Sequence, residues 1–222
     1  MDEARAFSER TVAEGRLVLA PLPLGPGDWL AGFPEEKALV GENAALARRQ
    51  AFEGGRAALR RALAHFGIPP FAIVKDERGA PVMPSGFVGS ISHKTELAVA
   101  IANPFDGFTL GIDVEAVKAP KGDIAPRILR EEERAEVELL LPEERVRGLL
   151  VRFALKEAVY KAIDPFVRRY VDYRDCAVSY GAAGEARITL FLRPGEPALD
   201  CTARFFDEGQ HVVAIARARV RS

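Results

Sequence analysis

Five charged side chains in two short segments can together bind one hard cation and a polyphosphate. Asp113 and Glu115 lie two residues apart in a predicted strand, so they share one face of it, because side chains alternate faces along a strand. Further along the chain, Lys156, Glu157 and Lys161 lie in a predicted helix. Mg²⁺ prefers carboxylate oxygens as ligands, and fixed cations stabilise the charge on phosphoryl oxygens. These residues therefore indicate phosphoryl-group chemistry.

Both segments also have a simpler structural interpretation. A half-exposed strand with a polar outer face explains Asp113 and Glu115 equally well. Glu157 and Lys161 form an i,i+4 pair that contributes only ~0.2–0.5 kcal/mol and is common on solvated helices. Two aromatic residues that flank Glu157, at positions 153 and 160, argue against a plain solvent face. They suggest that this side of the helix is covered by protein or lines a cleft.

A histidine in the first half of the chain is a candidate phosphate ligand. His93 follows a run of glycine and serine that includes Ser92, whose hydroxyls and backbone N–H groups suit phosphate oxygens. A lone histidine is more often a structural residue, and that interpretation stays open. A Ser-His-Asp hydrolase is a poor fit, because the chain has no G-x-S-x-G nucleophile elbow.

Arginines gather on one stripe of the first predicted helix. Arg49, Arg56 and Arg60 fall on the stripe and Arg48 lies beside it. Such a stripe is usually solvated, but Gly54-Gly55 interrupts this helix at a cost of roughly 1 kcal/mol per glycine relative to alanine. That cost indicates that another chain segment or a ligand approaches closely. Guanidinium groups match phosphate oxygens bidentately, so the terminal phosphate of a nucleotide would suit them.

Composition restricts the class of protein. The chain has 222 residues, enough for one domain or two small ones. Its net charge of −1 produces no overall field that attracts nucleic acid, and no apolar run approaches the ~20 residues that span a bilayer. The charged N-terminus lacks the apolar stretch of a secretory signal. These features predict a cytoplasmic protein with no membrane or nucleic-acid partner, in which Cys176 and Cys201 are reduced and bind no zinc.

Hydrophobic periodicity and Gly/Pro positions predict a mixture of helices and strands. We expect strand then loop at 17–35, a long helix at 35–66, a polar turn at 75–84, strands at 88–102 and 108–114, helices at 126–164 with a new one opening at Pro142, and strands at 176–180, 187–192, 202–206 and 212–216. The expected core stripe of the last helix consists of Val151, Leu155, Ala158, Val159 and Ala162.

The two halves of the chain share a weak internal similarity. Residues 97–102 resemble residues 212–216, and each half has a helix followed by strands that end in this sequence. Chance among core strands rich in Ala, Val and Ile is one explanation. The other is a pair of related α+β halves, residues 1–108 and 109–222, with a cleft between them. The segment with Asp113 and Glu115 would then lie at their junction, where ligand sites are often found.

Taken together, these motifs resemble the 4′-phosphopantetheinyl transferase superfamily, in its surfactin/enterobactin-synthase component D type. The resemblance rests on Gly89–His93, Gly111–Glu115, Phe153–Lys161, Arg49–Arg56 and Arg78–Pro84, in the family's order over residues 35–165. It implies an α+β fold of two similar α/β halves related by a pseudo-twofold axis, with the active site in the cleft between them.

The resemblance also implies an activity. The family transfers the 4′-phosphopantetheine arm of coenzyme A to a serine of an acyl or peptidyl carrier protein and releases adenosine 3′,5′-bisphosphate. The expected metal is Mg²⁺, or Mn²⁺. The expected partners are carrier proteins of polyketide, nonribosomal peptide (siderophores such as enterobactin included) or fatty-acid synthases. A monomer is expected, because the resemblance places the whole active site within one chain.

Residue roles follow by the same resemblance. Asp113, Glu115 and Glu157 would surround the metal, and Glu157 would also be the general base for the carrier serine. His93 would contact phosphate, and Lys161 would assist the leaving group. The residues expected to bind coenzyme A are Arg48, Arg49, Arg56, Lys75, Arg78, Ser92, His93, Lys156 and Lys161. Which of the two adjacent arginines faces the ligand is open, because they lie about 100° apart on the helix.

Three positions depart from the family pattern without removing a chemical group: Phe153 replaces a common Trp, Ala158 a common Ser, and Ala80 a Lys of some members. Two other functions stay open. One is another metal-dependent nucleotidyl- or phosphotransferase, although no P-loop is present; the other is a non-catalytic protein that binds coenzyme A or carriers. Phe166, Val167 and Tyr170 are candidates for contacting the carrier or the pantetheine arm, with the core as the alternative.

Overall fold

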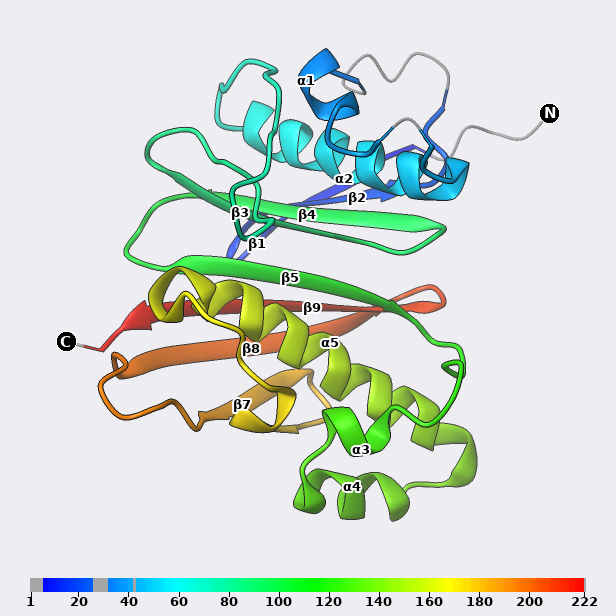
Figure 1. Cartoon of the computed structure of the whole chain (residues 1–222). Helices are drawn as coiled ribbons and strands as arrows, with labels where there is room; N and C mark the ends of the chain where they lie inside the picture. Colours follow the sequence, from blue (N-terminus) through cyan, green and yellow to red (C-terminus); the bar gives the residue numbers. More distant parts are fainter. Residues whose placement is uncertain (1–5, 26–31, 42, 222) are drawn as a thin grey trace. The chain divides into compact units, whose positions relative to one another are not determined.

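Two β-sheets, each covered by one long helix, make up the part of the chain that the structure describes (Figure 1). The structure is a computed structural model that describes residues 6–25, 32–41 and 43–221. The chain divides into two units, Met1–Leu110 and Gly111–Ser222. The α+β class expected from the sequence is confirmed. No helix among the described residues has both the length and the apolar character needed to cross a membrane.

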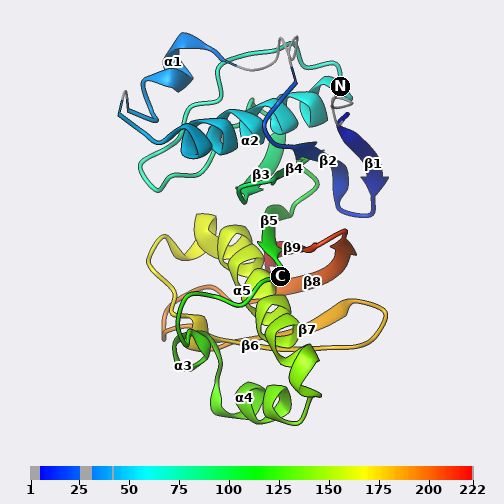
Figure 2. The ribbon, with the colours of Figure 1, turned by 90° about the vertical axis from the view of Figure 1, so that its right-hand side faces the viewer.

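The N-terminal unit is a four-stranded antiparallel sheet with helix α2 on one face. The strand order is β1 (Ser8–Val12), β2 (Gly15–Pro21), β4 (Leu97–Pro104) and β3 (Phe87–His93). Helix α2 (Leu46–Ala64) packs on the three strands β2, β4 and β3 (Figure 2). Its buried residues, with those of the sheet, form the hydrophobic core of this unit.

The long helix predicted at 35–66 is wrong, because the chain forms two helices there. Helix α1 (Pro34–Lys37) ends early, and α2 begins only at Leu46. Between them Gly41 has a φ of +82°, a left-handed conformation that cannot continue a helix. Strand β1 was not predicted, since its sequence SERTV is mostly polar; it lies at the edge of the sheet, where few apolar residues are required.

The two adjacent glycines of α2 allow the helix to approach the sheet closely. A Cβ atom at Gly54 would overlap the Leu22 side chain, and one at Gly55 would lie 2.5 Å from Cγ2 of Ile91 in β3. The prediction that another segment approaches this helix is therefore confirmed, and the segments are strand β3 and the residue that follows strand β2. Dense packing outweighs the low helix propensity of glycine here.

The C-terminal unit is a five-stranded sheet with helix α5 on one face. The strand order is β5 (Thr109–Ala116), β9 (His211–Val220), β8 (Leu199–Glu208), β7 (Glu185–Leu190) and β6 (Cys176–Tyr180). Helix α5 (Pro142–Val167) begins at the predicted proline and packs on β9 and β8. Its predicted core stripe is confirmed, since all five residues are at most 1% exposed.

Three short helices accompany α5 in this unit. They are α3 (Ala125–Ile128), α4 (Glu131–Glu138) and the 3₁₀ helix η1 (Tyr173–Asp175). Helices α3 and α4 pack on α5, and α3 also contacts η1. Helix α5 ends where Arg168 adopts a left-handed conformation with a φ of 47°. The chain then turns back and brings η1 alongside the middle of α5 (Figure 1).

The two segments that resemble each other in sequence occupy similar places in their units. Residues 97–102 lie in β4 and residues 212–216 in β9. Each strand is interior to its sheet, is almost completely buried and lies under the long helix of its unit. The shared Ala/Val-rich pattern therefore has a common physical cause, because small apolar residues let a helix lie close to the strand.

Gly111 sets the separation between β5 and α5. A Cβ atom there would overlap the carbonyl oxygen of Ala158 and lie 2.7 Å from the backbone nitrogen of Ala162. Because these are backbone atoms, the helix itself must move, so we expect Gly111→Ala to lower the free energy of unfolding by about 1–3 kcal/mol. Urea unfolding measures this change. Gly181→Ala is the matched control, since no atom lies within 4 Å of its Cβ position; equal stability of the two variants would contradict the prediction.

Both cysteines are free thiols in the C-terminal unit, where Cys176 is buried and Cys201 is partly buried. Burial raises the pKa of Cys176 and of Cys201 to about 12. A thiol with such a pKa holds almost no nucleophilic thiolate near neutral pH. Neither cysteine is therefore a candidate nucleophile, and the chemistry must come from other residues.

Candidate functional site

The two carboxylates of β5 are buried beside α5. Asp113 is 5% exposed and Glu115 6% exposed, while Ile112 and Val114 point to the other face and are fully buried. The polar outer face considered from the sequence is therefore wrong for this strand. Two buried carboxylates lower the stability of the fold unless cations or hydrogen-bond donors satisfy them. Solubility does not explain them, because they hardly contact solvent.

Lys161 reaches from α5 to β5. Its ammonium group donates to the Asp113 carboxylate at 2.8 Å and to the Ile112 carbonyl at 2.8 Å. The side chain is 28% exposed and that of Asp113 only 6% exposed, so the pair lies at the boundary between the interior and solvent. The simple interpretation of Lys161 as a solvated partner of Glu157 is therefore wrong, because its donors point to the strand.

Glu157 lies on α5 and is held by a residue that the sequence did not suggest. The hydroxyl of Tyr173 in η1 donates a short hydrogen bond to Oε1 of Glu157. The ring of Tyr173 packs edge-on against Phe153, with centroids 5.6 Å apart. Burial raises the pKa of Tyr173 well above its ordinary value, and the bond to Glu157 raises it further, so the hydroxyl stays a donor. The prediction that protein covers this side of the helix is confirmed.

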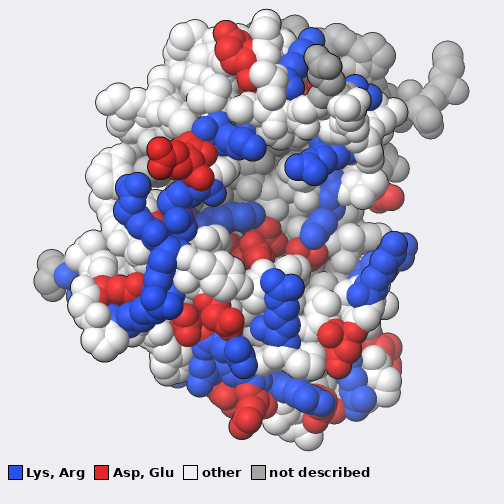
Figure 3. All heavy atoms as spheres, viewed as in Figure 1, with Lys and Arg blue, Asp and Glu red and all other residues white. Residues whose placement is uncertain are grey.

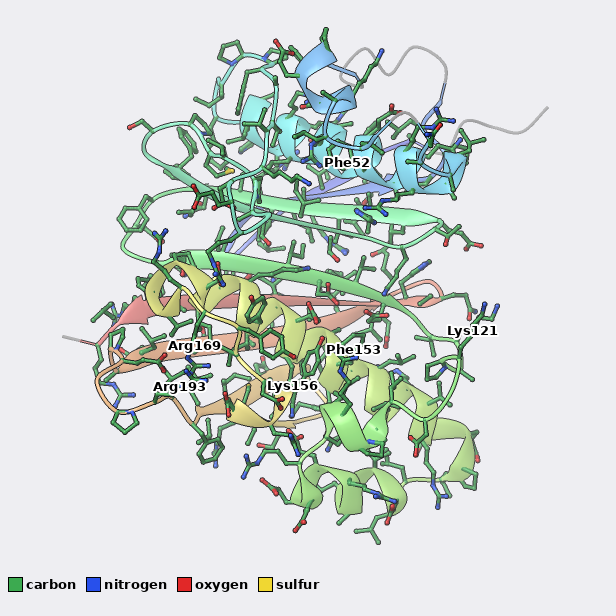
Figure 4. All side chains as sticks on the ribbon, in the orientation of Figure 1. Phe52, Lys121, Phe153, Lys156, Arg169 and Arg193 are labelled. Carbon is green, nitrogen blue, oxygen red and sulfur yellow. The ribbon has the colours of Figure 1, made fainter. Side chains whose placement is uncertain are left out.

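Lys156 projects from α5 (Figure 4), and its hydrogen bonds form an internal network. Its ammonium group donates to Oε2 of Glu133 at 2.6 Å and to the backbone carbonyls of Ile128 and Tyr173 at 2.9 and 3.0 Å. The residue is 2% exposed. Since an ammonium group has three N–H donors and all three are engaged, this geometry does not support the predicted bond between Lys156 and pyrophosphate.

Glu133 completes this network from α4. One oxygen accepts from the backbone N–H of Val178 at 2.7 Å, and the other accepts from the N–H of Arg130 at 2.9 Å as well as from Lys156. Glu133 is 2% exposed. One buried ion pair thus joins α3, α4, α5, η1 and β6. Periodicity gave no signal of it, because Glu133 stands in an acidic run typical of a solvated helix.

The carboxylates fit Mg²⁺ or Mn²⁺ in chemical type. Mg²⁺ takes oxygen ligands and usually one or two protein carboxylates together with phosphate oxygens. Asp113 and Glu115 offer such a pair on one strand face, and both are held almost out of solvent. Among the described residues, no group of three or more His, Cys, Asp and Glu side chains is arranged to hold a metal. The three-carboxylate set with Glu157 stays a prediction.

The predicted coenzyme A ligands of the N-terminal unit differ in exposure. Arg48 and Arg49 are both exposed in the first turn of α2. Arg56 is only 7% exposed; its guanidinium lies over the Phe52 ring at 3.3 Å and donates to the Ile73 carbonyl at 2.8 Å. Burial lowers the pKa of Arg56 to about 10. Its main observed contacts are thus structural.

Arg60, on the same stripe of α2, is a structural residue. It is 1% exposed and forms a buried ion pair with Glu36, whose Oε1 also accepts from the Ile73 N–H at 2.6 Å. The arginine stripe is therefore solvated, as considered from the sequence, only near the N-terminal end of α2. Towards the middle of α2, the arginines fix neighbouring segments of the chain.

His93 and Ser92 end β3 beside α2. His93 is exposed and Ser92 is 9% exposed. A Cβ atom at Gly55 would lie 3.9 Å from Cδ2 of His93, so the missing side chain brings the histidine next to the helix. The structure thus places His93 beside the middle of α2, and its role in binding phosphate stays a prediction.

Lys75 and Arg78 project from a tight turn. Oδ1 of Asp76 accepts from the backbone N–H groups of Arg78 and Ala80, both at 2.9 Å, and Gly79 has a φ of +88°. Both basic side chains are exposed. The turn is rigid because its own side chain satisfies its backbone, and it presents two cations to solvent.

The three candidate contacts of the carrier or the pantetheine arm, at and just after the end of α5, differ in exposure. Phe166 and Val167 pack against the hydrophobic core, which supports the alternative considered for them. Tyr170 is 61% exposed and lies 6.5 Å from the Tyr160 ring. On the face seen in Figure 3, basic and acidic side chains of the C-terminal unit are interspersed rather than gathered by sign.

Two family models match the chain. The model described as 4′-phosphopantetheinyl transferase N-terminal domain matches residues 35–103, and the model of the 4′-phosphopantetheinyl transferase superfamily matches residues 109–216. Asp113, Glu115, Glu157 and Lys161 all lie within the second match. Together the two matches include every residue singled out above as a candidate ligand.

Curated relatives carry the same description. The 4′-phosphopantetheinyl transferase PptT of Mycobacterium tuberculosis is 31% identical over 152 residues, 68% of this chain and 66% of its own length. The transferase Npt of Nocardia iowensis is 33% identical over 152 residues, 68% of this chain and 67% of its own length. The chain therefore spans about two thirds of the curated relatives it matches.

The solved structure of an ACPS–CoA complex from Chronobacterium ammoniagenes is a more distant match. It has a TM-score of 0.44 and 17% sequence identity, covering 53% of this chain and all of that one.

Proposed function

Because this chain belongs to the 4′-phosphopantetheinyl transferase superfamily, we propose that it transfers the phosphopantetheine arm of coenzyme A to a serine of a carrier protein. The observation that carries the proposal is the arrangement at β5 and α5. There Lys161 is bonded to the buried Asp113, and Glu157 is held on the same helix by Tyr173. These are the groups that such a transfer needs: a cation for phosphate, oxygen ligands and a base.

Glu157 is the proposed general base. A serine hydroxyl is a weak nucleophile and needs a base to take its proton as it attacks. In the proposed reaction the serine oxygen bonds to the phosphorus that carries the pantetheine arm, and its proton passes to Glu157. The phosphoanhydride bond of coenzyme A breaks, and adenosine 3′,5′-bisphosphate leaves with the electron pair.

Asp113 and Glu115, with Glu157, are the proposed ligands of Mg²⁺ or Mn²⁺. When bound, the metal would neutralise charge on the pyrophosphate as the bond breaks. Lys161 is the proposed cation for the departing phosphate, since it already lies against Asp113 and is partly exposed. Preorganised charges of this kind are usually the largest single contribution to catalysis of phosphoryl transfer.

The proposed contacts with the nucleotide end of coenzyme A come from the N-terminal unit. The exposed cations Arg48, Arg49, Lys75 and Arg78 suit its 3′-phosphate, and His93, with Ser92, is proposed to bind phosphate oxygens. Arg56 remains a proposed ligand of coenzyme A, but with a smaller contribution than the exposed cations, since its guanidinium is largely buried. Lys156 is not retained as a ligand, for the reasons given above.

The proposed partners are carrier domains of polyketide, nonribosomal peptide or fatty-acid synthases, siderophore synthases included. Each offers the same serine, so the chemistry supports the class rather than one member. We propose a monomeric cytoplasmic enzyme. Exposure of Tyr170 keeps it as a candidate contact of the carrier or the arm.

Intact-protein mass spectrometry tests this function. An apo acyl carrier domain is incubated with the protein, coenzyme A and Mg²⁺, beside a carrier whose acceptor serine is replaced by alanine. We expect a mass gain of one phosphopantetheine that requires both the metal and the serine. A series of apo acyl and peptidyl carriers that all stay unmodified, while coenzyme A still binds, would overturn the proposal in favour of a non-catalytic binding protein.

A further inference from the structure

One residue outside the proposed machinery holds the proposed base. Tyr173 contacts α5 through three of its groups: its hydroxyl donates to Glu157, its ring packs on Phe153, and its carbonyl accepts from Lys156. The adjacent residues Lys156 and Glu157 thus both bond to Tyr173: Lys156 bonds to its backbone carbonyl, and Glu157 bonds to its side-chain hydroxyl.

The backbone of Tyr173 is fixed independently of Glu157. Its carbonyl is tied to the buried ion pair of Lys156 and Glu133, with side chains 1% and 2% exposed. Asp172 caps η1 by accepting from the Arg174 N–H at 2.9 Å. The backbone of Tyr173 is therefore held in place beside α5 by Lys156 and by the Asp172 cap of η1. Neither of these contacts involves the Glu157 carboxylate.

The consequence concerns the two oxygens of Glu157. A carboxylate on a helix otherwise rotates about its side-chain bonds, which carry appreciable conformational entropy. With Oε1 held by the Tyr173 hydroxyl, the carboxylate adopts fewer orientations, and the range of positions open to Oε2 is narrower. A base or metal ligand must be held within a fraction of an ångström of its working position to be effective.

We propose that Tyr173 is a positioning residue for Glu157, and that Lys156 acts one step further out by positioning Tyr173. This inference rests on the proposed function, since it assigns a role relative to the proposed base. It also gives Lys156 a role other than phosphate binding. The lysine fixes the backbone of Tyr173 through its carbonyl, and the hydroxyl of Tyr173 orients the Glu157 carboxylate. Hydrogen-bond partners of metal-binding carboxylates typically change metal affinity or activity by 10–100-fold when removed.

Tyr173→Phe tests the inference, because it removes one hydroxyl and keeps the ring against Phe153. Two quantities are measured for the wild type and the variant: the affinity for Mn²⁺ in the presence of coenzyme A, followed by electron paramagnetic resonance of the free ion, and kcat for carrier modification. We expect about 10- to 100-fold weaker Mn²⁺ binding or a kcat lower by that factor, with a smaller change in KM for coenzyme A.

Tyr180→Phe is the matched control. Tyr180 ends β6, and its hydroxyl accepts from Arg152 at 3.3 Å, so the same atom is removed from the same unit at a site unconnected with Glu157. We expect both measured quantities to stay at wild-type values. An equal loss in the two variants would overturn the inference, because it would show a general effect of lost hydroxyls on folding.

The outcomes separate this inference from the function on which it rests. If the wild type modifies the carrier, and Tyr173→Phe matches it in Mn²⁺ affinity and kcat, the positioning role is wrong and the transferase function stands. If kcat falls only in proportion to the folded fraction, with Mn²⁺ affinity unchanged, the residue is merely structural and the inference is again overturned. If the wild type itself modifies no carrier, the proposed function fails and the inference fails with it.

Discussion

Glu157→Gln should lower kcat for carrier modification by about 10²–10⁴-fold, which is the range that general acid–base catalysis contributes. Glutamine has nearly the same shape, and its amide oxygen still accepts the hydrogen bond that Tyr173 donates to Glu157. The variant therefore keeps the local packing but cannot take a proton from serine. Initial rates of carrier modification, measured at saturating coenzyme A and Mg²⁺, give the change.

The matched control is Glu138→Gln at the end of α4. That carboxylate is 60% exposed and pairs with its helix neighbour Arg134 at 2.9 Å. We expect wild-type kcat from it, and we expect Glu157→Gln to unfold at nearly the wild-type urea concentration. If Glu157→Gln kept more than about a tenth of the wild-type kcat, the base would have to be another group, because such a loss is only about 1.4 kcal/mol of transition-state stabilisation.

Local sequence patterns predicted the parts of the site that depend on neighbouring residues. The alternation of Ile112, Asp113, Val114 and Glu115 predicted two carboxylates on one face, and both lie on one face and are buried. The 3.6-residue period predicted the core stripe of α5. In each case the pattern arises from one element packing on one core, so a short window of sequence contains the whole cause.

Other parts of the site depend on contacts between distant residues, and sequence patterns did not predict them. Tyr173 and Glu157 are 16 positions apart, and Glu133 and Lys156 are 23 apart. A polar residue on a helix is interpreted as solvated unless its partner is known, so Glu133 in its acidic run gave no signal. The resemblance assigned Lys156 to phosphate binding. In the structure the residue is 2% exposed, and its ammonium group donates to acceptors of the protein itself.

The helix predicted at 35–66 failed for a similar reason. Its residues have suitable composition, but Glu36 on α1 is 2% exposed and bonds Arg60 on α2 and the Ile73 N–H. This buried contact requires α1 to lie beside α2 instead of continuing it. Tertiary packing therefore overrode local propensity, as it commonly does where a charged side chain has a buried partner.

Lys156→Met should lower the free energy of unfolding by about 3–5 kcal/mol, the range found when one partner of a buried ion pair is removed. Methionine fills a similar volume but leaves the Glu133 carboxylate buried at 2% exposure without its cation. It also removes one hydrogen-bond donor from each of the Ile128 and Tyr173 carbonyls. Urea unfolding at pH 7 measures the loss.

The double variant Glu133→Gln/Lys156→Met should recover part of that loss. The glutamine oxygen can still accept from the Val178 N–H, which Glu133 accepts at 2.7 Å, and no charge remains buried. If Lys156 instead served pyrophosphate, its replacement would leave stability close to wild type and weaken coenzyme A binding per folded molecule. Equal stability of the single and double variants would also contradict our account. A large loss in Lys156→Met, partly restored in the double variant, would show that this lysine acts on the fold that holds Tyr173 and, through it, on the proposed base.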